Sequence, residues 1–281
     1  VWVGIEEVLH THGVPLRVWY PLCPGMPRKI GVSSPEGRRR AIAHSAREAG
    51  EAETADVVRH VSFALAAASH RLRDLSDAYA SQLQHALANG TQHGDKFTNL
   101  GTFDLYLACH SFLVEACSAR DYLARFLAKH VYGGVAADSV AQLLKRYKDA
   151  LPGHPVQELL KKANDRKSPD AWMVRLNEYR DIITHRAPIS YLGLHSYIRL
   201  QVRQVNTDLS IPRAVFEVPD DPFAQGRSSF CDALDLFRRY HGKLMEFADF
   251  LVAYSPYPPS HLVVKESDII NLQRLPVVNT R

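Results

Sequence analysis

Apolar residues recur every three or four positions over several long stretches of this chain. The longest stretch covers residues 55–87 and a second covers residues 103–131. This spacing places the apolar side chains on one face of an α-helix. Glycines at Gly90 and Gly133 follow the two stretches, as is typical of helix ends. We therefore expect two long amphipathic helices that are joined by a short loop and pack antiparallel.

Three further stretches also have helical spacing. Two shorter helices are expected at residues 140–150 and 155–163. A long one is expected at residues 228–254, with Phe230 and Leu244 among its inward side chains, ending before a proline-rich segment.

A third main helix is expected between the short helices and the last one. It should open at Ser168, with this serine as N-cap and Pro169 at the first helical position. Pro188 disfavours helical backbone at Ala187, so the helix should end close to His185.

A different period appears between the third and fourth main helices. Apolar and polar residues alternate at residues 198–203 and again at 214–218, which predicts two strands of a β-hairpin. The fold class is therefore an all-α four-helix bundle, over residues 51–258, with a small β-hairpin insertion. Residues 1–50 should form an N-terminal extension and linker, and residues 259–281 a C-terminal tail.

Composition narrows the function classes only slightly. The 281 residues carry a net charge of +4, which permits a nucleic-acid partner through a local patch but does not require one. The four cysteines form no C-x-x-C pair, so we expect them to be reduced and mostly buried, in a cytoplasmic protein. No stretch is apolar for long enough to predict a membrane partner. The run from Arg38 to Arg40 could contact phosphate, but a solvated face is the favoured interpretation.

The chemistry-bearing residues lie at the end of the third predicted helix. Residues 180–185 read R-D-I-I-T-H, which combines Arg180, Asp181 and His185. Arginine offers a permanently charged planar fork for phosphate oxygens, and histidine can take and return a proton near neutral pH. These side chains could cut a phosphodiester without a metal. The simpler alternative is a helix-terminal histidine stabilised by the helix dipole, next to an arginine paired with Glu178 or Asp181.

This motif resembles the R-x4-6-H motif of the HEPN superfamily, including the polar residue directly after the arginine. The resemblance extends loosely over residues 55–255, because HEPN domains are four-helix bundles that carry the motif near the end of the third main helix. It implies a HEPN-like bundle and a metal-independent endoribonuclease of a toxin or antiviral defence system. Its partners would be RNA, a second copy of the chain, and an antitoxin or defence-complex protein.

The resemblance also assigns roles to the motif residues. His185 would act as general base or general acid, and Arg180 would stabilise the charge of the transition state. Asp181 would position one of them, and cleavage would leave 2′,3′-cyclic phosphate and 5′-hydroxyl ends without a cofactor. HEPN toxins that are controlled by adenylation carry a tyrosine two positions after the histidine. This chain has Ala187 there, so that route of control is not carried over.

Helix geometry sets a condition on this site. Residues five apart in an uninterrupted helix point roughly 140° away from each other, so Arg180 and His185 would not converge within one helix. A helix end could bring them together, or two motifs could complement each other across a dimer. We expect the composite, dimeric site.

Basic residues are frequent on both sides of the motif and could form a rim that follows the RNA backbone. The expected RNA-binding residues are Lys161, Lys162, Arg166, Lys167 and Arg186. The wider set adds Lys145, Arg146, Lys148, Arg199, Arg203 and Arg213. The alternative is that these side chains are only solvated.

Two other functions stay open at this point. The chain could be a non-catalytic HEPN-like module that dimerises or binds RNA or a nucleotide in a larger assembly. It could also be an unrelated bundle in which the motif is accidental. Of the remaining histidines, His241 is expected to be a core residue, and the pair His10 and His12 lacks a third metal ligand.

Overall fold

The computed structural model describes residues 35–91, 97, 99, 101–135, 137–147, 150–185, 199–204, 212–222 and 229–257. The helices in this part are α1 (Pro35–Glu48), α2 (Ala52–Ala88), α3 (Thr102–His130), α4 (Val140–Tyr147), α5 (Pro155–Asn164), α6 (Trp172–His185) and α7 (Ala233–Phe250), which a 3-10 turn at Leu251–Tyr254 extends. The strands are β1 (Arg199–Gln204), β2 (Pro212–Pro219) and β3 (Phe230–Asp232). The predicted all-α fold with a small β insertion is confirmed.

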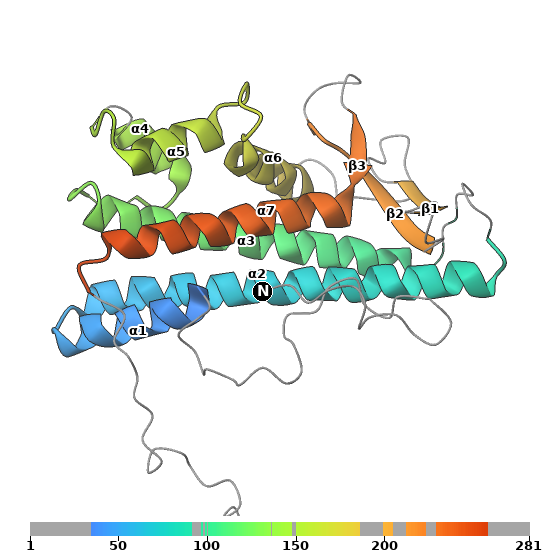
Figure 1. Ribbon diagram of the computed structural model, residues 1–281, viewed down its shortest axis with the longest axis horizontal. Helices are drawn as coiled ribbons and strands as arrows, with labels where there is room; N and C mark the ends of the chain where they lie inside the picture. Colours follow the sequence, from blue (N-terminus) through green and yellow to red (C-terminus); the bar gives the residue numbers. More distant parts are fainter. Residues whose placement is uncertain are drawn as a thin grey trace, which may run out of the picture.

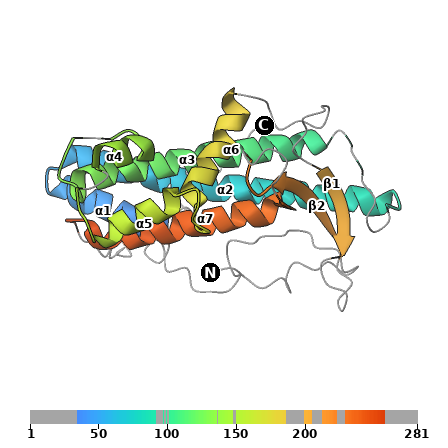
Figure 2. The same cartoon turned by 90° about the horizontal axis from the view of Figure 1, so that it is seen from above.

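Helices α2, α3 and α7 run along the long axis of the molecule, and α6 lies across them (Figures 1 and 2). The apolar faces of the three long helices meet in one continuous core. Phe112 of α3 stacks on Phe237 of α7 with ring centroids 5.3 Å apart, and Tyr179 of α6 meets Phe237 edge-on at 5.8 Å. These aromatic contacts join α3, α6 and α7 around one buried ring.

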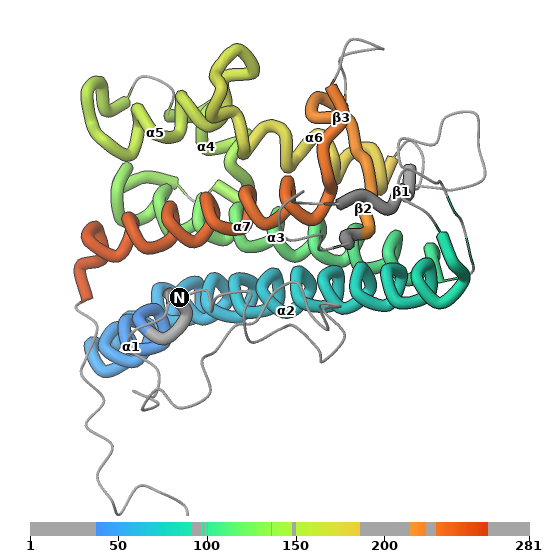
Figure 3. Tube along the Cα trace, turned by 45° about the vertical axis from the view of Figure 1, so that its right-hand side comes forward, coloured from blue at the N-terminus to red at the C-terminus, as the bar shows by residue number. Residues whose placement is uncertain are grey.

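Helix α1 differs from the expectation that residues 1–50 form an extension and linker. It lies along the first turns of α2 (Figure 3), and its Ile42 is fully buried. Arg39, expected to be solvated, is only 1% exposed, while Arg38 forms an ion pair with Asp249 of α7. The three arginines therefore have three different environments, with Arg40 alone exposed.

Helix α6 begins at Trp172, three residues later than the predicted first helical position at Pro169. The Ser168 hydroxyl accepts a hydrogen bond from the Asp170 backbone N–H at 3.1 Å, and the Ser168 carbonyl accepts one from Ala171 at 3.2 Å. These bonds close a turn before the helix instead of capping it. Short polar side chains stabilise such turns as well as helix N-caps, which explains the error.

The β structure is a three-stranded antiparallel sheet in the order β1-β2-β3. The predicted hairpin forms β1 and β2, with Leu200 opposite Phe216. The third strand replaces the predicted first turn of the last helix, and Phe230, expected to point inward, is 52% exposed. Asp232 then caps α7 by accepting hydrogen bonds from the backbone N–H groups of Leu234 and Asp235.

Several predictions about single side chains are confirmed. His241 is buried, with its Nε2 2.9 Å from the hydroxyl oxygen of Ser69. Cys109 and Cys117 are buried free cysteines. Within the ranges that the structure describes, none of the helices combines the length and the apolar character that crossing a lipid bilayer demands.

Candidate functional site

Helix α6 carries the motif and ends at His185, as predicted. It stays α-helical from Trp172 to its last residue, so no break separates Arg180 from His185. Their side chains therefore leave the helix on different faces, roughly 140° apart. This excludes a helix end as the way to bring the two together within one copy of the chain.

The crossing of α6 over α3 fixes the first half of the motif helix. Leu176 and Met173 are fully buried at this crossing. The thiol of Cys117 donates to the Leu176 carbonyl oxygen at 3.7 Å, and Arg120 donates to the Met173 carbonyl oxygen at 3.4 Å. Burial raises the pKa of Cys117 to about 11, against the opposing effect of nearby Arg120. This cysteine is therefore a neutral packing residue.

A polar cluster of two arginines, two aspartates and one asparagine lies at the same crossing. Asn177 is its centre: its side-chain oxygen accepts hydrogen bonds from Nη2 of Arg120 and from Nη2 of Arg180, each at 3.1 Å. The Asn177 amide donates to Asp181 at 2.8 Å. Arg120 is buried and also bonds Asp121 through Nε and Nη2, at 3.0 and 2.9 Å. We call these five residues the crossing cluster.

Arg180 is held by this cluster on one side only. Its Nη2 lies 3.2 Å from a carboxylate oxygen of Asp181, so Asp181 holds the arginine. No described residue accepts a hydrogen bond from Nη1, and the Arg180 side chain is 33% exposed. Nε of Arg180 is buried, so Nη1 is the guanidinium group that the described part of the chain leaves for an external anion.

His185 is exposed at the last position of α6. Among the described residues, none forms a hydrogen bond or ion pair with it. Thr184 is also exposed, and its hydroxyl donates a hydrogen bond to the Arg180 carbonyl oxygen at 2.8 Å. The structure therefore brings Arg180 and Asp181 into contact, whereas His185 forms no hydrogen bond or ion pair with either of them.

Two residues near the motif have structural contacts. Glu178 is buried and forms ion pairs with Arg166 at 2.6 Å and Arg175 at 2.8 Å, and Arg175 also pairs with Asp221. Of the two partners that the simpler alternative gave Arg180, Glu178 is therefore wrong and Asp181 is confirmed. The contact of Arg120 with Asn177 could not be predicted from the sequence, since the two lie 57 positions apart and share no local pattern.

Three of the five expected RNA-binding residues have acidic partners. Lys161 lies 3.8 Å from Glu158, Lys162 lies 2.8 Å from Asp170, and Arg166 pairs with Glu178. Lys167 is exposed without a charged partner in the described part of the chain, as is Lys145. Arg146 donates to the Val135 carbonyl at 3.2 Å. Arg186 and Lys148 lie outside the described residues, and Arg199, Arg203 and Arg213 are positions of β1 and β2.

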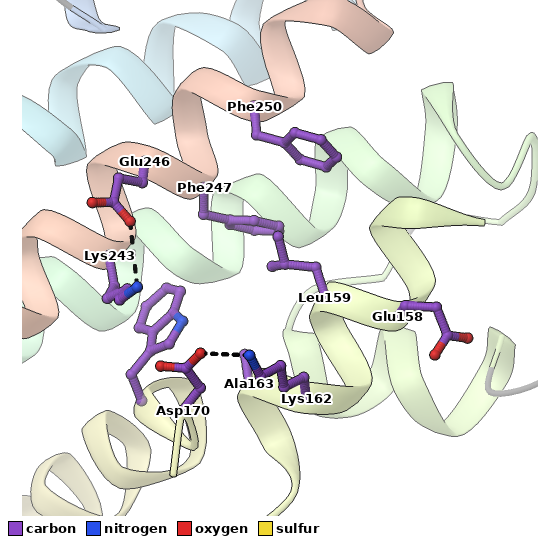
Figure 4. A pocket seen from close by; sticks show the side chains of 10 residues that line it. Glu158, Leu159, Lys162, Ala163, Asp170, Lys243, Glu246, Phe247 and Phe250 are labelled. Atoms are coloured by element: carbon purple, nitrogen blue, oxygen red, sulfur yellow. Dashed lines mark ion pairs between the residues drawn. The ribbon is translucent and has the colours of Figure 1, made fainter. Parts of the chain in front are cut away.

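Two cavities of several hundred Å³ lie away from the motif. One of about 490 Å³ opens between α5, α6 and α7 (Figure 4), and one of about 430 Å³ lies between α2 and α3; neither is lined by a motif residue. Within the described ranges, no group of three or more His, Cys, Asp or Glu residues is placed to hold a metal ion.

No family model matches the sequence, and neither a curated protein nor a solved structure matches it. The resemblance to the HEPN superfamily therefore stays a prediction. It rests on the motif and on the position of the motif in the third main helix.

Proposed function

We propose that this chain is a metal-independent endoribonuclease of HEPN type that acts as a homodimer. The observation that carries the proposal is the state of Arg180: Asn177 and Asp181 fix its Nη2, while Nη1 has no partner among the described residues and part of the side chain is exposed. A cation fixed on one side and available on the other is suited to bind a phosphate that gains charge in a transition state.

The reaction follows from the side chains of the motif. His185 takes the proton of a ribose 2′-hydroxyl, and the 2′-oxygen then attacks the adjacent phosphorus. The bond from phosphorus to the 5′-oxygen breaks, and a water molecule gives a proton to the leaving oxygen. The resulting hydroxide then takes up the proton that His185 holds. The products are a 2′,3′-cyclic phosphate and a 5′-hydroxyl. Asp181 acts as a positioning residue through its contact with Arg180.

Dimerisation supplies what one copy lacks, because a single α6 directs Arg180 and His185 to different faces. An apolar surface suited to a second copy lies beside the motif helix. Phe103, Leu107 and Val114 of α3 are 56%, 49% and 44% exposed, and their spacing of four and seven residues places them on one face. Helix α6 crosses α3 and projects past it (Figure 2). Large exposed apolar side chains in a row are typical of an interface.

The test is cleavage of a single-stranded RNA in excess EDTA by the unmodified chain, Arg180→Ala and His185→Ala. We expect each substitution to lower the rate by at least about a hundredfold, the usual contribution of general acid–base and charge-stabilising groups. Arg238→Ala is the matched control, since Arg238 is a partly exposed helical arginine on α7. It should cleave as the parent does.

Mapping the new ends tests the proposed chemistry, and loss of cleavage in the motif variants distinguishes it from a contaminating nuclease. Cyclic-phosphate ends that disappear in both motif variants support the proposal. If the folded dimer does not cut RNA but binds it, the chain is instead the non-catalytic HEPN-like module, for which the separation of His185 from Arg180 is the favouring observation.

A further inference from the structure

A second candidate site lies at the other end of α6. The cavity between α5, α6 and α7 holds about 490 Å³, which is within the range of small-molecule sites. Trp172, at the start of α6, lines it, whereas Arg180 lies eight residues later, roughly 12 Å along the helix axis. The cavity is therefore separate from the motif, and a ligand could bind there whether or not the chain is a ribonuclease.

The inner wall of this cavity is aromatic and apolar (Figure 4). Trp172 and Phe247 are buried and meet edge-on with ring centroids 6.3 Å apart. Figure 4 shows Phe247 beside Leu159. Phe250 of α7 and Leu159 of α5 complete the wall. Side chains of this kind favour a flat apolar group, which loses contact with water when it enters.

Charged side chains lie only at the mouth. Lys162 pairs with Asp170 at 2.8 Å, and Lys243 pairs with Glu246 at 3.5 Å, as the dashed lines in Figure 4 show. Lys162, and then Lys243, lower the pKa of the Asp170 carboxyl. Two ammonium groups thus act on one carboxylate beside the indole of Trp172.

A smaller polar cavity of about 200 Å³ adjoins the first one. The two share Asp170, Trp172 and Lys243, and the smaller cavity adds Arg175 and Arg239. Arg239 pairs with Asp220, which also lines the smaller cavity, and Arg175 pairs with Glu178 and Asp221. A ligand whose body lies against the aromatic wall would therefore direct a polar group toward the shared residues Asp170 and Lys243. The ion pair between Lys162 and Asp170 is largely exposed, and exposed pairs contribute little stability, so an anion can replace the Asp170 carboxylate at low cost.

We propose that this cavity binds a small ligand with a flat aromatic body and one anionic group. The body lies against Trp172, Phe247 and Phe250, and the anion lies between Lys162 and Lys243 in place of the Asp170 carboxylate. The charge on the ligand, and not its apolar body alone, determines affinity.

Naphthalene-1-sulfonate and its neutral counterpart naphthalene-1-sulfonamide test this directly, since they share a body and differ in charge. Binding is followed by calorimetry and by the indole N–H resonance of Trp172 in the full chain, assigned with Trp172→Phe. We expect both compounds to shift this resonance, and the sulfonate to bind roughly two- to fivefold more tightly, the ratio that one exposed charge pair supplies. Equal affinities, or an unmoved Trp172 resonance, overturn the proposal.

Three variants separate the contribution of the charged side chains to binding from that of the aromatic wall. Asp170→Asn removes the competing carboxylate and should tighten sulfonate binding roughly two- to fivefold, while sulfonamide binding stays unchanged. Lys243→Gln should weaken only the sulfonate, and Phe250→Ala should weaken both compounds. Lys167→Gln, an exposed lysine that does not line either cavity, is the matched control and should change neither. Weaker sulfonate binding by folded Asp170→Asn contradicts the proposed place of the anion.

Discussion

The crossing cluster predicts a defined loss of stability when Asn177 is replaced by leucine. Asn177→Leu keeps the size of the side chain but removes its acceptor for Arg120 and Arg180 and its donor to Asp181. The bond to Arg120 dominates, because Arg120 is 4% exposed and water cannot easily replace the lost partner.

The magnitude follows from these environments. A hydrogen bond to a charged group contributes about 1.5–3 kcal/mol, and Arg120 keeps Asp121 as a second partner, which favours the lower half of this range. Arg180 and Asp181 are each about a third exposed, so the two bonds to them add less than about 1 kcal/mol together. We expect Asn177→Leu to lower the free energy of unfolding by about 2–3 kcal/mol.

Urea unfolding followed by far-ultraviolet circular dichroism measures this loss. A double-mutant cycle with Arg120→Met then isolates the contact: the double variant should lose about 1–2 kcal/mol less than the sum of the single losses. Thr184→Val, at an exposed position on the same helix, is the control and should cost less than about 0.5 kcal/mol. Additive losses in the cycle would refute the direct contact between Arg120 and Asn177.

Three further predictions concern other parts of the molecule. Burial lowers the pKa of His241 to about 4, so its imidazole binds a proton at a higher pH in the unfolded chain than in the folded one. Between pH 7 and pH 5 the parent should therefore lose about 2 kcal/mol more of its free energy of unfolding than His241→Gln does. Equal losses in urea titrations at the two pH values contradict this. Tyr79→Phe removes the hydroxyl that forms hydrogen bonds with Asp232 and with the Leu234 N–H, each at 3.2 Å. The substitution should lower the melting temperature in calorimetry by about 3–6 °C, and an unchanged melting temperature argues against these bonds. Leu107→Glu should convert the proposed homodimer to a monomer in light scattering, while Val135→Glu, at an exposed position after α3, should not. A homodimer that tolerates Leu107→Glu contradicts the proposed surface.

The long helices could be predicted from the sequence because their apolar periodicity extends over many turns. Helix α1 could not, since its buried face consists mainly of alanines such as Ala41 and Ala46, which give a weak apolar signal after three arginines. Only packing on α2 makes this face part of the core. Likewise, local residue preferences do not distinguish the turn at Ser168 from a helix N-cap, and strand β3 depends on its pairing with β2.

The candidate site was predictable in its residues but not in its arrangement. The motif indicates Arg180, Asp181 and His185, and spacing within a helix indicates that two of them diverge. The partner of Asn177 comes from α3, and many of the basic side chains expected to contact RNA have acidic partners from neighbouring turns or other elements. Lys161 and Glu158 lie three positions apart in one helix, but the other pairings depend on tertiary structure and leave no pattern along the chain.

The composite ribonuclease site is tested most directly by a purified heterodimer of Arg180→Ala and His185→Ala, obtained by co-expression with two different affinity tags. In this heterodimer one of the two composite sites retains both Arg180 and His185, while the other has neither. We expect RNA cleavage in EDTA at about half the parental rate, although each homodimeric variant is inactive. A heterodimer as inactive as both homodimers would contradict a site built from two motifs.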